Sequence, residues 1–142
     1  MNLKPRCIQA NGTLSSIRET TEVVDGQDLE LVEAEYTSAP LLQVTVGTNA
    51  PQGGDSGHGG RTLLRFEDLG GFDATVLFEG KRFQLSKLEI VCGGDCEAQM
   101  IVEALRNAAD TLEEQIKDNQ EKRPAWPELE AEPTAKEVGL SK

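Results

Sequence analysis

The amino-acid sequence predicts an α+β fold, in which an antiparallel meander sheet of about five strands packs with one long C-terminal helix. Two observations lead to this class. From residue 28 to residue 92, apolar and polar residues alternate in short runs separated by turns containing glycine, proline or serine, which is typical of half-buried strands. From residue 95 onward, apolar residues recur at helical spacing instead. The length of 142 residues is that of one ordinary domain.

The alternating part of the sequence divides into five expected strands. Short links between them favour antiparallel neighbours that are joined in chain order. Glu79-Gly80 is expected to form a tight hairpin turn, because glycine readily supplies a residue with positive φ. The apolar residues of the last strand change parity after Leu85, which predicts a β-bulge. The strands are expected over residues 28–36, 41–46, 61–67, 72–78 and 82–92.

The N-terminal segment, residues 1–27, carries a weaker pattern. A short helix is predicted over residues 13–24, ended by the Asp25-Gly26 pair. The prediction depends on four residues that lie at helical spacing: Leu14, Ile17, Thr21 and Val24.

The C-terminal helix is the clearest single element. Gly93-Gly94 ends the sheet, and Asp95 is a suitable N-cap. The helix carries an amphipathic stripe that must bury one face, against the sheet or as a dimer seam: Ile101, Leu105, Ala108, Leu112 and Ile116. The pattern fails past Lys117. We therefore expect a sheet-plus-helix ligand-binding domain over residues 28–118 and an extended or disordered acidic tail over residues 119–142.

Charge and cysteine content exclude several classes of function. The net charge of −11 and the pI of about 4.5 argue against binding of duplex nucleic acid, which needs clustered Lys and Arg. No run approaches the roughly 18 apolar residues of a membrane-spanning helix, and residues 1–20 lack the apolar core of a signal peptide. The three cysteines are an odd number without framework spacing. A cytoplasmic protein is therefore expected.

The most informative stretch is the glycine-rich segment between residues 47 and 62. Closely spaced glycines allow positive φ and close approach of a ligand, and such a loop can turn several N–H groups toward one anion. Arg61 at its exit is suited to a bidentate phosphate contact. The alternative is a flexible connection without a ligand. The segment's expected ligand-binding residues are Thr48, Asn49, Gly54, Asp55, Ser56, His58, Arg61 and Thr62.

Two catalytic or metal-binding interpretations are weaker. Gly54-Asp55-Ser56-Gly57 matches the residues around the nucleophile of chymotrypsin-like serine proteases, but His58 follows the serine, whereas that fold places His and Asp before it. Cys92 and Cys96 have no second cysteine pair, so zinc is not expected. We expect no catalytic residues, no metal and no cofactor.

Two further features stay open on the residues alone. Arg106 lies beside the apolar stripe of the helix, where it is either a boundary arginine with its stem on the sheet or a phosphate clamp between subunits. The phenylalanines are mostly core residues, but one of them is suited to stacking on a base.

Four segments of the chain carry a likeness to a known family. They are Val44-Thr45-Val46-Gly47-Thr48-Asn49, Gly53-Gly54-Asp55-Ser56-Gly57-His58-Gly59-Gly60-Arg61-Thr62, Glu103-Ala104-Leu105-Arg106 and Leu112-Glu113-Glu114-Gln115. Together they resemble the type 1 Thoeris anti-defence proteins of bacteriophages. The resemblance covers roughly residues 41–115, and the glycine-rich segment is its most specific part.

The resemblance implies a sponge rather than an enzyme. In Thoeris immunity a TIR protein makes a cyclic ADP-ribose isomer that activates an NAD-depleting effector. Proteins of this family bind that messenger without cleaving it, are associated with capture of cyclic oligonucleotides at a separate site, and form hexamers as trimers of dimers. Their messenger site uses helix arginines and an aromatic residue that stacks on adenine. Only Arg106 is carried over; Asp110 stands where a second arginine is expected, and the aromatic is not assigned among Phe72, Phe78 and Phe83.

Three functions therefore compete. The first is a homo-oligomer in the cytoplasm of an infected bacterial host that sequesters cyclic nucleotide messengers. The second is a hydrolase or lyase of the same messengers that uses His58 with Asp55. The third is an acidic interaction protein without a small ligand.

Overall fold

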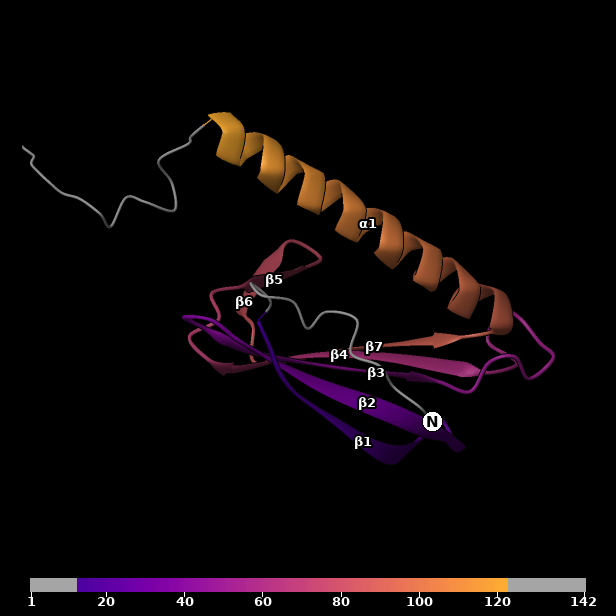
Figure 1. The fold of residues 1–142 in the computed structure, drawn as a ribbon. Helices are drawn as coiled ribbons and strands as arrows, with labels where there is room; N and C mark the ends of the chain where they lie inside the picture. The colour runs from indigo at the N-terminus through magenta and orange to yellow at the C-terminus, as the bar shows by residue number, and fades with distance from the viewer. Residues whose placement is uncertain (1–12, 123–142) are drawn as a thin grey trace, which may run out of the picture. The chain divides into compact units, whose positions relative to one another are not determined.

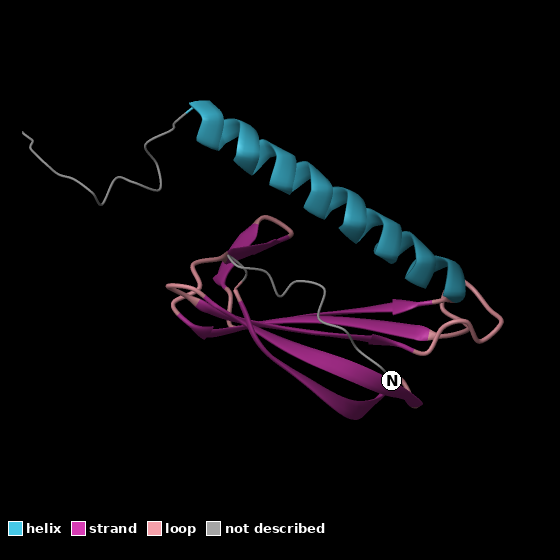
Figure 2. Ribbon diagram, in the orientation of Figure 1, coloured by secondary structure: helices cyan, strands magenta, loops and turns pink. Residues whose placement is uncertain are grey.

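The computed structural model describes residues 13–122, and within them the chain forms seven strands and one helix (Figures 1 and 2). Five strands make one antiparallel sheet in the order β1-β2-β3-β4-β7, and β5 and β6 make a separate two-stranded sheet. The α+β class and the antiparallel five-stranded meander are confirmed. The elements are β1 (Leu14–Val24), β2 (Gln27–Thr37), β3 (Leu41–Thr48), β4 (Arg61–Gly70), β5 (Thr75–Phe78), β6 (Lys81–Gln84), β7 (Lys87–Gly93) and α1 (Asp95–Lys122).

The predicted N-terminal helix is wrong, because residues 14–24 form strand β1. This strand pairs along its length with β2. Asp25 and Gly26 both have positive φ, 50° and 78°, which is the geometry of a two-residue hairpin turn with the twist that flanking strands require. The segment is also rich in β-branched residues, which favour strands. An Asp-Gly pair between such residues is therefore a hairpin signal, not a helix stop.

The fourth and fifth predicted strands differ from the structure in their bounds. The Phe72 amide donates to Asp68 Oδ1 across the turn that follows β4, and β5 begins only at Thr75. The predicted last strand is divided in two. Its first part, β6, pairs with β5 through the expected Glu79-Gly80 turn, and its second part, β7, pairs with β4. The parity change after Leu85 marks a passage between two sheets rather than a bulge.

The main sheet curls so that its first strand approaches its fourth. Arg65 Nη2 of β4 lies 2.7 Å from Glu22 Oε1 of β1, although β2 and β3 lie between these strands in the sheet. On the other side of Arg65, Glu89 of β7 contacts its Nε at 2.6 Å. Burial lowers the pKa of Arg65, but the hydrogen bonds to the two glutamates outweigh this and raise it above its ordinary value.

A cluster of buried apolar residues lies on the face of the sheet that this curl encloses. It consists of Val24, Leu29, Leu31 and Leu63. The β1–β2 turn and the start of β4 both contribute to it, which brings them to the same end of the sheet as the connection between β3 and β4. The glycine-rich segment therefore begins and ends beside this cluster.

Helix α1 runs from Asp95 to Lys122, past the end that the sequence pattern predicts. The remainder of the predicted tail and the first part of the N-terminal segment lie outside the described residues. The chain divides into two units at Met100–Ile101, inside the helix. Within the described residues, no helix combines the length and the apolar composition needed to cross a membrane.

Candidate functional site

The glycine loop, residues 49–60, connects the end of β3 to the start of β4. The side chains of Thr48 and Thr62 face each other across these strands, with 2.8 Å between their hydroxyl oxygens. Asn49 ties the base of the loop: its Oδ1 accepts the Arg61 amide at 2.8 Å, and its Nδ2 donates to Gln27 Oε1 at 2.8 Å. The base of the loop is therefore fixed to β2 and β4 by side-chain amide groups.

The amides of the glycine loop converge on one carboxylate of the same chain, that of Asp95. Oδ1 accepts the amides of Gln52 and Gly60, each at 2.9 Å. Oδ2 accepts the amides of Gln52 at 2.9 Å, Gly53 at 2.6 Å and Gly54 at 3.1 Å. The hydrogen bonds from Gly60 and Gln52 are the largest causes that lower the pKa of Asp95 to about 2, because they stabilise the charged form.

The loop can wrap the carboxylate because glycine stands where a side chain would intrude. A Cβ at Gly59 would lie 2.2 Å from the Gly54 carbonyl oxygen and 2.9 Å from Asp95 Oδ1, and Gly59 has φ of +73°. A Cβ at Gly54 would lie 2.7 Å from the Gly59 nitrogen. The expected close approach to an anion is thus present, and the anion is a side chain.

The loop in turn accepts hydrogen bonds from the first main-chain amides of helix α1. Asp55 Oδ1 accepts the Cys96 amide at 2.8 Å, and the Asp95 amide donates to the Gly54 carbonyl at 2.7 Å. The first bond of the helix runs from Ala98 N–H to the Gly94 carbonyl, so Gly94 and not Asp95 occupies the N-cap position. Contact with Asp55 is also the largest cause that raises the pKa of the Cys96 thiol.

Arg61 closes the loop from its other side. Its Nε donates to Asp25 Oδ2 at 3.0 Å, and its Nη1 and Nη2 donate to the carbonyls of Gly57, Gly59 and Gly60 at 3.0–3.2 Å. Its side chain is only 15% exposed. The guanidinium that the sequence suggests for a phosphate therefore holds the loop's own carbonyl groups.

The expected site residues fall into three groups. Thr48, Asn49, Gly54, Asp55, Arg61 and Thr62 meet in one hydrogen-bonded cluster. Ser56 and His58 lie at the outer part of the loop and are exposed. Arg106 is also exposed and belongs to the second unit, on helix α1. Among the described residues, no group of three or more His, Cys, Asp or Glu side chains is arranged to hold a metal ion.

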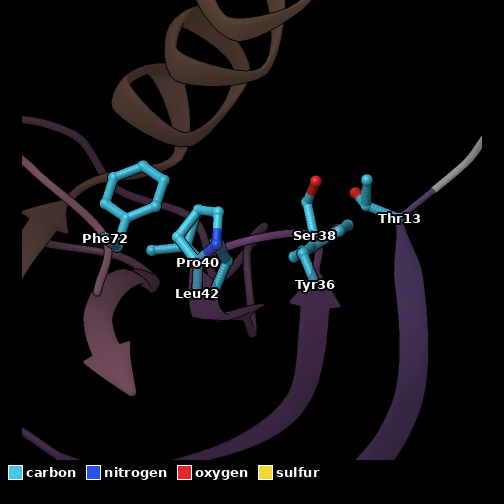
Figure 3. Close-up of a pocket in the computed structure, with 7 residues that line it drawn as sticks. Thr13, Tyr36, Ser38, Pro40, Leu42 and Phe72 are labelled. Carbon is cyan, nitrogen blue, oxygen red and sulfur yellow. The ribbon is translucent and has the colours of Figure 1, made fainter. Parts of the chain in front are cut away.

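A second candidate site lies at the opposite end of the sheet, where β2 ends and β3 begins. It is an apolar cavity of about 380 Å³. Phe72 stands on one side of Pro40 and Leu42, and Tyr36 and Ser38 stand on the other (Figure 3). The cavity is lined by Thr13, Tyr36, Ser38, Pro40, Leu42, Val44 and Phe72.

Sequence reasoning missed this cavity. Of its lining, only Phe72 was a candidate, as one of three aromatics for base stacking. Alternation within one strand places Leu42 and Val44 on the same face, but only the pairing of β2 with β3 shows that Tyr36 lies opposite Leu42 on that face. Ser38 and Pro40, from the link between the two strands, complete this part of the lining.

Comparisons with protein-family models, with curated proteins and with solved structures gave no match.

Proposed function

We propose that this protein is a bacteriophage sponge that binds and sequesters, without cleaving, the cyclic ADP-ribose-type messengers of Thoeris defence in the cytoplasm of the infected host. Cyclic oligonucleotides of related immune systems form a second proposed ligand class. The support from sequence is the likeness of residues 44–62 and of the helix around Arg106 to the type 1 Thoeris anti-defence family.

The observation that carries the proposal is the cavity between Tyr36 and Phe72. Its volume of about 380 Å³ lies at the low end of the range for small-molecule sites, which is roughly 300–1,000 Å³. It therefore suits one nucleobase with part of its sugar rather than a whole cyclic dinucleotide. Stacking of a base on an aromatic ring contributes about 1–3 kcal/mol, and the Ser38 hydroxyl at the rim offers a polar contact.

The contacts of Asp55 favour binding over cleavage. A catalytic His58 would need a carboxylate that orients its ring. Asp55 is the nearest in sequence, but its Oδ1 accepts the Cys96 amide. It contacts His58 through its main-chain carbonyl, which accepts the His58 amide at 3.1 Å. This use of Asp55 disfavours the hydrolase or lyase alternative.

The exposed face of helix α1 supports a homo-oligomer. Val102, Leu105, Leu112 and Ile116 are 44%, 44%, 59% and 54% exposed. Together with Ala109 they are spaced by three and four residues in alternation, which is the seam of a coiled-coil pair. We propose that two chains pair along this seam, and that pairs assemble into the hexamer that the family resemblance implies. A neighbouring chain would then hold the part of the messenger that the cavity leaves uncovered, with Arg106 as a phosphate contact.

The test is recovery of the ligand. The protein is incubated with a cyclic ADP-ribose isomer, freed of unbound ligand and then heat-denatured, and the released material is analysed by chromatography. The proposal expects stoichiometric recovery of unchanged messenger, and native mass spectrometry of the loaded protein gives the number of chains. A new product in place of the messenger supports the enzyme alternative. Absence of both retention and thermal stabilisation, which a tight ligand should cause, supports the third function, an interaction protein without a small ligand.

A further inference from the structure

The glycine loop has the features of a complete oxyanion site. Four main-chain amides, those of Gln52, Gly53, Gly54 and Gly60, reach both oxygens of the Asp95 carboxylate at 2.6–3.1 Å. Hydrogen bonds from amides to an ionised group are stronger than bonds between neutral groups. The glycine at position 59 leaves room that a Cβ would fill. These are the elements with which proteins bind phosphate and carboxylate ligands.

The group that occupies this site is the Asp95 side chain of the same chain, and both the side chain and the main chain of Asp95 are hydrogen-bonded to the loop. The Asp95 side chain occupies the cradle, and the Asp95 amide donates to the Gly54 carbonyl at 2.7 Å, so main chain and side chain are fixed together. Asp55 makes the reciprocal contact with the Cys96 amide. Hydrogen bonds therefore join the loop and the first turn of helix α1 in both directions: loop amides donate to the Asp95 carboxylate, and the amides of Asp95 and Cys96 donate to the loop.

We propose that the glycine loop is a carboxylate receptor filled in cis by Asp95, and that this filled receptor is the joint that fixes the first turn of helix α1 to strands β3 and β4. A tethered group acts at an effective concentration of millimolar order or above. A free phosphate or carboxylate at lower concentration therefore does not displace Asp95 in the wild-type protein.

The test is chemical replacement of the missing carboxylate. Asp95→Ala removes the carboxylate and leaves the amide cradle, and formate supplies the same group in solution. We expect Asp95→Ala to melt at a lower temperature than wild type. Sodium formate should raise that temperature along a saturating curve, relative to sodium chloride at equal ionic strength. Wild type should respond equally to the two salts.

Glu97→Ala is the matched control. Glu97 also accepts a loop amide, that of Ser56, but through one long contact of 3.4 Å. Its removal opens no cradle, so this variant should show no specific response to formate. An equal response of all three proteins to formate, or an Asp95→Ala variant that melts with wild type, would overturn the proposal.

Hydrogen exchange on the wild-type protein keeps the proposal testable if Asp95→Ala does not fold. Bound amides in a loop exchange slowly, whereas exposed ones exchange at the rate of an unstructured peptide. The amides of Gln52, Gly53 and Gly60 should exchange at least about tenfold more slowly than that reference. Exchange of these three amides at the unstructured rate would contradict the proposal.

Discussion

The two ends of the main sheet are built on opposite principles. At the end where β3 passes into β4, a loop of glycines and charged residues satisfies its amides, carbonyls and guanidinium with partners from the same chain. At the other end, the side chains of β2, β3 and the turn before β5 leave an apolar cavity beside two aromatic rings. The end whose sequence looks like a binding site is filled, and the end whose sequence looks ordinary is open.

Because the two ends differ in this way, we expect the loop to contribute to the stability of the protein and the cavity to contribute to ligand affinity. Substitutions in the glycine loop remove hydrogen bonds that hold the first turn of helix α1, so they should lower stability. Substitutions in the cavity remove contacts with a ligand, so they should lower affinity.

The largest effect is expected at Gly59. In Gly59→Ala the new Cβ would lie 2.2 Å from the Gly54 carbonyl oxygen, at a φ of +73°. Loss of the loop geometry should lower the free energy of unfolding by about 3 kcal/mol or more. Gly53→Ala is the control, because φ is also positive there but no atom lies within 4 Å of the Cβ. It should cost about 1 kcal/mol, as measured by urea denaturation. Equal losses in the two variants would show that the cradle is not what requires Gly59.

The next largest effect is on ligand affinity at the cavity. Phe72→Ala should weaken messenger binding about tenfold or more, because a stacked aromatic is lost, while the melting temperature changes little. Isothermal titration calorimetry measures the affinity. Phe78→Ala is the control, because Phe78 is 61% exposed and does not line the cavity. A loss of affinity in Phe78→Ala but not in Phe72→Ala would place the stacking residue on the small β5–β6 sheet instead.

A pH effect is expected at the loop end. The pKa of Asp95 falls from 3.8 to about 2 on folding. A carboxylate with a lowered pKa stabilises the folded state above its unfolded pKa, and loses that contribution as pH falls through the folded value. The stability difference between wild type and Asp95→Asn should therefore be constant above about pH 5 and shrink between about pH 4 and pH 2, as followed by thermal denaturation. A difference that is unchanged down to pH 2 would show that the charge of Asp95 does not stabilise the loop.

The smallest effect is expected on the outer helix. Arg106→Ala should weaken messenger binding about fivefold to tenfold, the value of one exposed charge-assisted contact, without changing the melting temperature. Lys117→Ala, another exposed basic residue of the same helix, is the control in the same titration. An unchanged affinity in Arg106→Ala would remove this residue from the site.

The sequence was sufficient for much of the fold because the signals there are local. Alternation identified β2, β3 and β4, and helical spacing identified α1. Residues 14–24 fit a helical pattern only through Leu14, Ile17, Thr21 and Val24, whereas their β-branched content and the Asp25-Gly26 turn favour the strand that forms. The second part of the last predicted strand corresponds to β7, but the separate β5–β6 sheet was not predicted. The change in the alternation of apolar residues after Leu85 fits a β-bulge as well as it fits the end of one strand and the start of another.

For the site, the sequence predicted the chemistry of the loop but not its occupant. Closely spaced glycines indicate an amide cradle for an anion, and the structure has one. The anion is Asp95, which is 43 residues from Gln52, and no sequence pattern encodes that contact. The cavity depends on which side chains share one face after β2 and β3 pair, which requires the register.

The most direct test of the account is amide chemical-shift mapping of wild-type protein with a cyclic ADP-ribose isomer. The account predicts the largest changes at Tyr36, Ser38 and Phe72, with the amides of Gln52, Gly53 and Gly60 unchanged because Asp95 retains them. Changes concentrated on those three loop amides, with none around the cavity, would contradict it.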